Sequence, residues 1–132
     1  MRNKILAFDL DETLCSRPTD VEHLGVDKYS YCTPIQSMID VVNKLYDEGH
    51  TIKIYTARGM HTFNGDVKRV YYNLYSVTKD QLDKWGVKYH LLVMGKEPYD
   101  LLIDDKCCRP REIFDNKDFG EFYGKISNES IQ

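Results

Sequence analysis

Two aspartates spaced by one residue follow an apolar run near the start of the chain, within Lys4–Thr13. In an extended segment the side chains alternate between two faces, so Asp9 and Asp11 project to one side while Leu10 turns toward the interior. Two carboxylates this close repel each other unless a cation lies between them. The segment therefore predicts a buried strand that delivers two carboxylates to the edge of a sheet, with a divalent metal, Mg²⁺, beside them.

The length and charge of the chain restrict the number of domains and the kinds of partner that it can bind. Its 132 residues suit one domain with one core, which we expect over residues 1–126, with a C-terminal tail at 127–132. The net charge of −3, without a basic tail, disfavours broad binding to nucleic acid or to anionic membranes, because both depend on clustered Lys and Arg. No apolar stretch is long enough to cross a membrane or to form a secretory signal, so we expect a cytoplasmic protein.

Neither a C-x-x-C pair nor the spacing of a zinc cluster occurs among the four cysteines, which are Cys15, Cys32, Cys107 and Cys108. The adjacent Cys107 and Cys108 can bridge each other only through a strained ring. We therefore expect four reduced thiols that behave as small buried hydrophobes, in preference to a disulfide or a metal site.

Hydrophobic spacing predicts an alternation of strands and helices. A loop or short hairpin is expected over residues 14–33, and Pro34 suits the first position of a helix that Gly49 ends. The later strands are expected at Thr51–Thr56, Val87–Val93 and Tyr99–Ile103, and the later helices after a loop within Ala57–Val77, from Thr78 to Trp85, and from Pro110 to Phe114. This alternation is typical of a three-layer, Rossmann-like α/β fold with helices on both faces of a parallel sheet.

Such sheets bind ligands outside the carboxyl ends of their strands. Polar residues follow three of the predicted strands: Asp9 and Asp11 the first, Thr56 the second, and Asp104 and Asp105 the last. Because these ends meet at one edge of the sheet, we expect the five residues to contribute to one site.

Together these residues resemble the four motifs of the haloacid dehalogenase (HAD) superfamily, over about residues 4 to 115. The motifs are Asp9-Leu10-Asp11-Glu12-Thr13, Thr56 at a strand end, Lys96, and Asp104-Asp105 after an apolar strand. The chain is similar, more closely still, to small phosphatase-like proteins associated with capsule and surface-polysaccharide biosynthesis. That similarity is carried by Tyr55-Thr56-Ala57-Arg58-Gly59, Trp85-Gly86-Val87-Lys88-Tyr89-His90, Gly95-Lys96 and Ile103-Asp104-Asp105-Lys106.

The resemblance implies a Mg²⁺-dependent phosphatase that passes through a phosphoaspartate. Asp9 would be the nucleophile. Asp11 would protonate the leaving alkoxide and then activate water, and its backbone carbonyl would ligate the metal. Of the acidic pair, Asp105 is expected as the direct metal ligand and Asp104 as its neighbour, with the reverse assignment left open.

A phosphoryl group must have its negative charge neutralised before a carboxylate can attack it. Mg²⁺ between Asp9 and the Asp104-Asp105 pair would bind one phosphoryl oxygen, and Lys96 would bind another. Thr56 fits as a hydroxyl donor to the same group.

Loop residues complete the predicted site. The backbone N–H groups of Leu10 and Ala57 are expected to help bind the phosphoryl group. Arg58, His61 and Arg69 are candidate substrate contacts, each weighed against an ordinary surface role, since exposed polar residues are common in loops.

The gaps between the motifs are too short for the cap domain that members of this superfamily commonly carry. Residues 14–33 accommodate a flap, and residues 57–77 hold one loop and one helix. A capless site admits a bulky substrate or is closed by a second copy of the chain, so a homo-oligomer is compatible with this sequence. The resemblance to the capsule-associated phosphatases implies a small phosphorylated sugar, polyol or related precursor as the substrate.

Two alternatives are kept open. Capless relatives include phosphatases of nucleic-acid 3′ ends, although the net negative charge disfavours this substrate. The second alternative is a non-enzyme, either a phospho-accepting signalling domain or a catalytically silent binding domain. Signalling receivers use similar residue types on a parallel sheet, but in them the acidic pair follows the first strand, whereas here Asp104-Asp105 comes last. The lifetime of the phosphoaspartate distinguishes a signalling domain from an enzyme.

Overall fold

The computed structural model describes residues 3–115, so the tail expected at 127–132 lies outside the described residues. The chain divides into two compact units, one of Ile5–Pro98 and one of Met1–Lys4 with Tyr99–Gln132. The expectation of one domain over 1–126 stays a prediction. The elements in chain order are β1 (Ile5–Phe8), β2 (Cys15–Ser16), η1 (Thr19–Tyr31), β3 (Thr33–Pro34), α1 (Gln36–Asp47), β4 (Thr51–Tyr55), α2 (Val67–Lys84), β5 (Leu91–Val93) and α3 (Pro110–Asp115).

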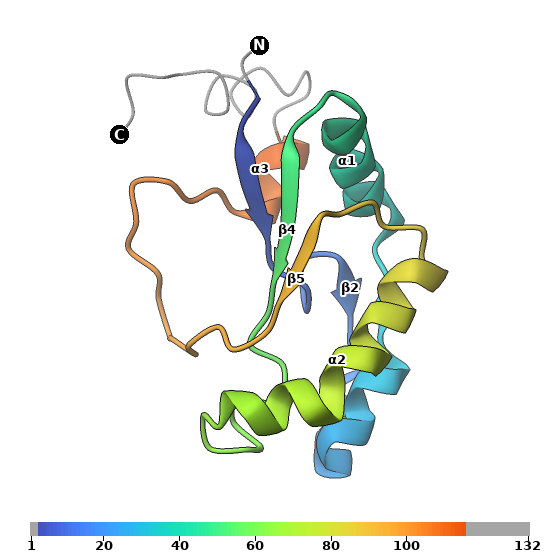
Figure 1. Ribbon diagram of the computed structural model, residues 1–132, viewed down its shortest axis with the longest axis vertical. Helices are drawn as coiled ribbons and strands as arrows, with labels where there is room; N and C mark the ends of the chain where they lie inside the picture. Colours follow the sequence, from blue (N-terminus) through green and yellow to red (C-terminus); the bar gives the residue numbers. More distant parts are fainter. Residues whose placement is uncertain (1–2, 116–132) are drawn as a thin grey trace. The chain divides into compact units, whose positions relative to one another are not determined.

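A three-stranded parallel sheet is the centre of the Ile5–Pro98 unit, with the strand order β1-β4-β5 (Figure 1). Ile5 of β1 is opposite Thr51 of β4, and Lys53 of β4 is opposite Leu91 of β5. Helix α1 joins β1 to β4 and α2 joins β4 to β5, as parallel neighbours require. The predicted mixed α/β class, with helices flanking a parallel sheet, is confirmed.

Helix α1 forms where the apolar spacing predicts it. Met38, Ile39, Val42 and Leu45 are buried along one face, at the three- and four-residue intervals that place side chains on the same side of a helix. Pro34 does not open this helix, because it is paired in β3 and α1 begins two residues later.

Helix α2 is a single helix where the sequence predicts two. The Asp66 side chain caps its start by accepting a hydrogen bond from the Arg69 N–H at 3.3 Å. Thr78, expected to cap a second helix, lies inside α2 and is fully buried beside Leu74 and Leu82. Continuous burial of one face outweighs the weak propensity of Thr to break a helix.

The segment between β1 and α1 is more structured than the expected loop or short hairpin. Strands β2 and β3 do form a short antiparallel pair, with Cys15 opposite Pro34. The two strands are separated by η1, a 3₁₀-helical stretch that is broken at Gly25, where φ is 62°. Val21 and Tyr29 are buried, so they anchor this flap to the rest of the unit.

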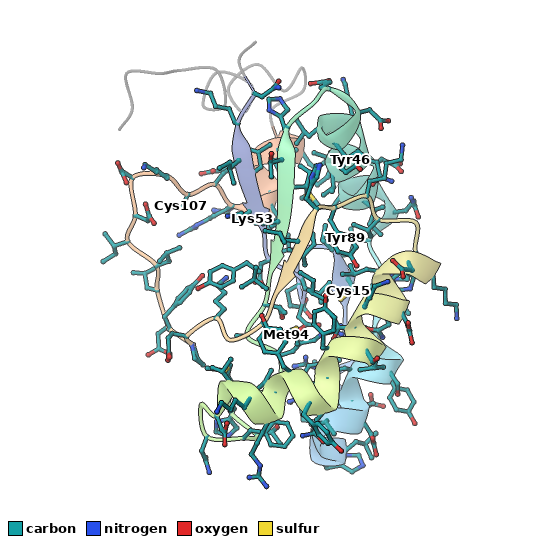
Figure 2. The ribbon with its side chains drawn as sticks, in the orientation of Figure 1. Cys15, Tyr46, Lys53, Tyr89, Met94 and Cys107 are labelled. Atoms are coloured by element: carbon teal, nitrogen blue, oxygen red, sulfur yellow. The ribbon has the colours of Figure 1, made fainter. Side chains whose placement is uncertain are left out.

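Packing between α2 and the end of β5 brings the later part of the unit together. Met94, which directly follows β5 and is labelled in Figure 2, is buried and its N–H donates to the Tyr71 hydroxyl of α2 at 3.0 Å. Strand β5 begins at Leu91, later than the expected Val87.

Two strand predictions need correction. Within residues 3–115, strand β1 lies at the edge of the sheet and its Ile5 is 68% exposed, so it is not the buried strand that was expected. Residues 99–103 form no strand, and Leu101 and Ile103 are exposed. A β-rich apolar run becomes a strand only where a neighbouring backbone pairs with it, and local composition does not supply that partner.

The second unit contains α3, which covers the expected short helix from Pro110 to Phe114. Among residues 3–115, no helix is both long and apolar enough to cross a lipid bilayer. All four cysteines are free thiols, as predicted. Only Cys15 and Cys32 are buried, whereas Cys107 and Cys108 are exposed.

Candidate active site

Asp9 follows β1 directly and faces solvent, with 42% of its side chain exposed. Its Oδ1 accepts the N–H of Leu10 at 2.8 Å, and its Oδ2 lies 3.8 Å from the Lys96 Nζ. Partial burial raises the pKa of Asp9, while the Leu10 amide and the Lys96 charge act in the opposite direction and the neighbouring Asp11 adds to the rise. Asp9 is therefore an accessible carboxylate beside a cation.

Lys96 reaches Asp9 because its backbone extends the sheet beyond β5. The Thr56 N–H donates to the Val93 carbonyl at 3.0 Å, and the Lys96 N–H donates to the Thr56 carbonyl at 3.1 Å. The Lys96 ammonium also lies 5.5 Å from the centre of the Tyr55 ring. The structure thus brings Asp9, Thr56 and Lys96 to the same edge of the sheet, where the ends of the strands predict Asp9 and Thr56 and the family resemblance adds Lys96.

Thr56 is buried at this edge and shapes the turn after β4. Its hydroxyl accepts the Arg58 N–H at 3.1 Å, which fixes the backbone that carries the Arg58 side chain. A hydroxyl that accepts one hydrogen bond still has its own proton to donate. The expected role of Thr56 as a donor to a phosphoryl group stays a prediction.

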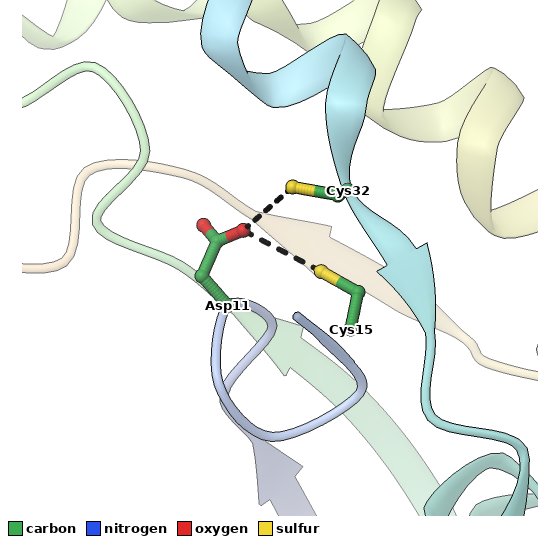
Figure 3. Close-up of side chains that lie close together, drawn as sticks. All are labelled: Asp11, Cys15 and Cys32. Atoms are coloured by element: carbon green, nitrogen blue, oxygen red, sulfur yellow. Dashed lines mark hydrogen bonds between the residues drawn. The ribbon is translucent and has the colours of Figure 1, made fainter. Parts of the chain in front are cut away.

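The Asp11 side chain has different surroundings from Asp9. It sits in a tight turn in which the Glu12 N–H donates to the Cys15 carbonyl at 2.7 Å and Glu12 has a φ of 64°. Arg58 donates from Nε to Asp11 Oδ2 at 3.0 Å and from Nη2 to Oδ1 at 3.1 Å. The thiols of Cys15 and Cys32 point at the same Oδ1, at 3.5 and 3.6 Å (Figure 3).

Arg58 is the most enclosed charged residue of this cluster, with a side chain 0% exposed. Its Nη1 donates to the Gln81 Oε1 at 2.6 Å and to the Thr78 hydroxyl at 3.2 Å, both on α2. Its guanidinium lies 4.8 Å from the centre of the Tyr29 ring. Burial lowers the pKa of Arg58, but the charge and hydrogen bonds of Asp11 outweigh burial and raise it.

Arg58 was expected either to read the substrate or to lie on the surface, and the structure places it in neither position. Its donors already bind groups of the chain itself. Gly59, which follows it at a φ of 77°, donates its N–H to the Tyr29 hydroxyl at 2.9 Å, and a Cβ there would lie 2.5 Å from the Leu74 Cδ1. The turn that directs Arg58 inward therefore requires glycine at position 59.

Asp11, Cys15 and Cys32 also form a group of metal-ligand types, with one ligand atom from each lying within 4.8 Å of the others. The Arg58 Nη2 lies 3.1 Å from the Asp11 Oδ1, 3.7 Å from the Cys15 Sγ and 3.5 Å from the Cys32 Sγ. The guanidinium thus supplies the positive charge at this position. A hydrogen bond between the two thiols lowers the pKa of Cys32 with help from Arg58, whereas the same bond and burial raise the pKa of Cys15.

Asp104 and Asp105 belong to the second unit and are described there alone. The Asp104 Oδ1 accepts the Lys106 N–H at 2.8 Å, and this bond, followed by a hydrogen bond from Asp105, lowers the pKa of Asp104. Their expected role as metal ligands stays a prediction.

The other loop residues predicted to bind the phosphoryl group or the substrate are Leu10, Ala57, His61 and Arg69. The Leu10 N–H already donates to Asp9, and the Ala57 carbonyl accepts the Met60 N–H at 3.0 Å. His61 and Arg69 are exposed, with the Arg69 guanidinium 5.8 Å from the Phe63 ring.

The sequence did not predict which residues bind Arg58 and thereby fix its contact with Asp11. Tyr29, Cys32, Thr78 and Gln81 are separated from position 58 by 20 or more residues, so no local spacing identifies them. The one available signal was the arginine two residues after the predicted strand-end Thr56, which does not reveal the direction of its side chain.

Comparison with known proteins adds a fold relative. No family model matches this sequence, and no curated protein matches it. The crystal structure of an MCSG target protein from Vibrio cholerae is similar to this structure, with a TM-score of 0.76. The two sequences are 28% identical over an alignment that covers 94% of this chain and 99% of the other.

Proposed function

We propose that this protein is a Mg²⁺-dependent phosphomonoesterase of the HAD superfamily. The observation that carries the proposal is the exposed Asp9 carboxylate at the end of β1, with the Lys96 ammonium 3.8 Å away and Asp11 two residues on. A nucleophilic carboxylate beside a cation is what transfer of a dianionic phosphoryl group requires. The motif order supports a capless, HAD-like member with η1 and its flanking strands as the flap.

The oxygen donors at this edge fit a hard cation. Mg²⁺ prefers carboxylate and carbonyl oxygens, which the Asp9 side chain and the Asp11 backbone provide, and Asp104 and Asp105 are the further ligands that the sequence predicts. The thiols beside Asp11 suit a softer metal, and the Arg58 guanidinium already lies against them. When bound, Mg²⁺ would neutralise the charge of the phosphoryl oxygens.

The residues of the chain then divide the reaction into two displacements. In the first, which requires Asp11 to carry a proton, the Asp9 oxygen forms a bond to phosphorus while the bond to the leaving oxygen breaks, and that oxygen takes the proton from the Asp11 carboxyl group. In the second, a water oxygen bonds to phosphorus as the bond to Asp9 breaks, and Asp11 takes the water proton. Lys96 binds a phosphoryl oxygen throughout, and the Thr56 hydroxyl donates to another.

We propose a small phosphorylated sugar, polyol or related precursor of surface polysaccharide as the substrate. The support for it is the resemblance of the Tyr55–Gly59 and Trp85–His90 segments to capsule-associated phosphatases, together with the short gaps between motifs. The proposed setting is the cytoplasm.

A panel of phosphorylated metabolites, assayed with Mg²⁺ by release of inorganic phosphate, tests this function. The wild-type chain should turn over at least one sugar or polyol phosphate, and Asp9→Asn should not. Equal phosphate release by Asp9→Asn would overturn the assignment of the nucleophile. A preference for a 3′-phosphorylated oligonucleotide over the whole panel would instead favour a nucleic-acid-end phosphatase.

A further inference from the structure

We infer that Arg58 is a positioning residue that holds the Asp11 carboxylate in the orientation needed for proton transfer. This inference rests on the proposed function and goes beyond it, because in this role Arg58 touches neither the substrate nor the phosphoryl group and binds Asp11 instead. It acts through Asp11 alone.

The contact between the two side chains fixes an orientation as well as a distance. Arg58 approaches Asp11 with two nitrogens, Nε at 3.0 Å from Oδ2 and Nη2 at 3.1 Å from Oδ1. A planar guanidinium that contacts both oxygens restrains rotation of the carboxylate, whereas a single ammonium donor would leave it free to rotate. At Asp9 the nearby cation is the ammonium of Lys96, a single nitrogen 3.8 Å from Oδ2, in place of a planar guanidinium.

Arg58 is itself held from several directions, so it serves as a rigid support. Gln81 and Thr78 of α2 bind its Nη1, and the Tyr29 ring of η1 packs 4.8 Å from the guanidinium. Gln81 is fixed in turn, because its Nε2 donates to the Tyr29 carbonyl at 2.7 Å. The chain therefore connects the flap and α2 to the Asp11 carboxylate through one side chain.

A purely stabilising role explains this arrangement poorly. Removing a guanidinium from water is costly, and a buried ion pair is often no more stabilising than apolar side chains of the same volume. Arg58 and its partners occupy a place that Leu or Met side chains would fill with less desolvation. The selective benefit that remains is a defined position for Asp11, which a catalytic acid and base needs.

Paired aryl phosphates of similar size provide the test. The wild-type chain, Arg58→Gln and Arg58→Lys are assayed with Mg²⁺ on 4-nitrophenyl phosphate and on phenyl phosphate. The nitrophenolate leaves without help, whereas phenolate, the conjugate base of an acid with a pKa of about 10, needs a proton from Asp11. The value of kcat/KM reports the first displacement, so the ratio of the two values measures proton donation.

If Arg58 positions Asp11, kcat/KM for phenyl phosphate should fall by about 30- to 100-fold in Arg58→Gln, and that for 4-nitrophenyl phosphate by about threefold or less. Arg58→Lys should restore part of the loss, since it keeps the charge without the two-nitrogen contact. In an Asp11→Asn background, Arg58→Lys should cause no further change in the ratio, because its effect passes through Asp11.

Leu82→Ala is the matched control for loss of stability, since Leu82 is buried on α2 and has no place in the proposed chemistry. It should lower both kcat/KM values equally, if at all. An equal loss for both substrates in the Arg58 variants, or no loss, would overturn the inference while the phosphatase proposal stands. Wild type that hydrolyses neither substrate faster than Asp9→Asn would overturn both.

Discussion

Asp9 and Asp11 are two residues apart and chemically identical, yet the regions around them differ in almost every physical respect. Asp9 is 42% exposed and has one nearby cation at 3.8 Å. Asp11 is 20% exposed and is bound through both oxygens by a fully buried guanidinium, with two thiols beside it. The difference indicates that the neighbours set the role: Asp9 is free to meet an incoming group, and Asp11 is held in place.

The largest expected effect is the loss of activity when the Asp9 carboxylate is removed. Asp9→Asn should lower kcat on the best phosphorylated substrate by at least about 10³-fold, because an amide oxygen cannot form the covalent intermediate. Steady-state release of inorganic phosphate in the presence of Mg²⁺ measures it. Asp11→Asn should still accept a phosphoryl group from a substrate with a good leaving group, so a burst without turnover would separate the two aspartates.

Removing the partner of Asp11 should have the largest effect on stability. Arg58→Gln leaves the Asp11 carboxylate and two thiols without their buried cation and should cost about 2–4 kcal/mol, lowering Tm by about 8–20 °C. Thermal unfolding followed by circular dichroism measures the change. Lys79→Gln, which breaks the exposed ion pair with Asp83 on the same helix α2, should move Tm by less than about 2 °C, and a similar shift in both variants would contradict a special role for the buried pair.

Mg²⁺ should bind at Asp9 and so stabilise the folded chain. A ligand that binds only the folded chain stabilises it, so saturating Mg²⁺ should raise the Tm of wild type by about 5–10 °C. Asp9→Asn should lose most of this increase in Tm. Cys32→Ser should keep it, because the Cys32 thiol contacts the side chains of Arg58 and Asp11 and is not a proposed metal ligand. Retention of the full shift in Asp9→Asn would place the metal elsewhere.

The smallest expected effect is a gain in stability without metal. Burial raises the pKa of Asp9, so its ionisation disfavours the folded chain. The gain from Asp9→Asn should be absent below the ordinary Asp pKa of 3.8 and should develop as the pH rises through the raised pKa of the folded state. Solvent screening keeps it to about 1–3 °C in Tm at neutral pH, and a lower Tm for Asp9→Asn under these conditions would contradict the direction of the shift.

Local patterns in the sequence were sufficient to predict most of the sheet and the edge that carries Asp9 and Thr56, while Lys96 was assigned to the site by the resemblance to a family. The apolar spacing of Met38 to Leu45 predicted α1, because helix burial leaves a periodic trace. Local composition failed at residues 99–103, where strand formation depends on a distant partner. It failed again at Thr78, whose place inside α2 follows from burial against the rest of the unit.

The same limit explains why the environment of Asp11 was not predicted. A buried arginine is recognised by its partners, and those of Arg58 come from β2, η1 and α2. An arginine in a polar loop has the same sequence signature whether it faces solvent or the interior. Tertiary packing alone distinguishes the two.

The long sequence separations around Arg58 also bear on the order of folding. Asp11 lies 47 residues from Arg58, and Gln81 lies 23 residues beyond it, so this cluster needs several chain segments to be closed at once. Contacts of this kind form slowly, because the entropy of loop closure must be overcome before they contribute. During refolding, helical signal should therefore return before activity does, and the delay would mark the moment at which Asp11 becomes aligned.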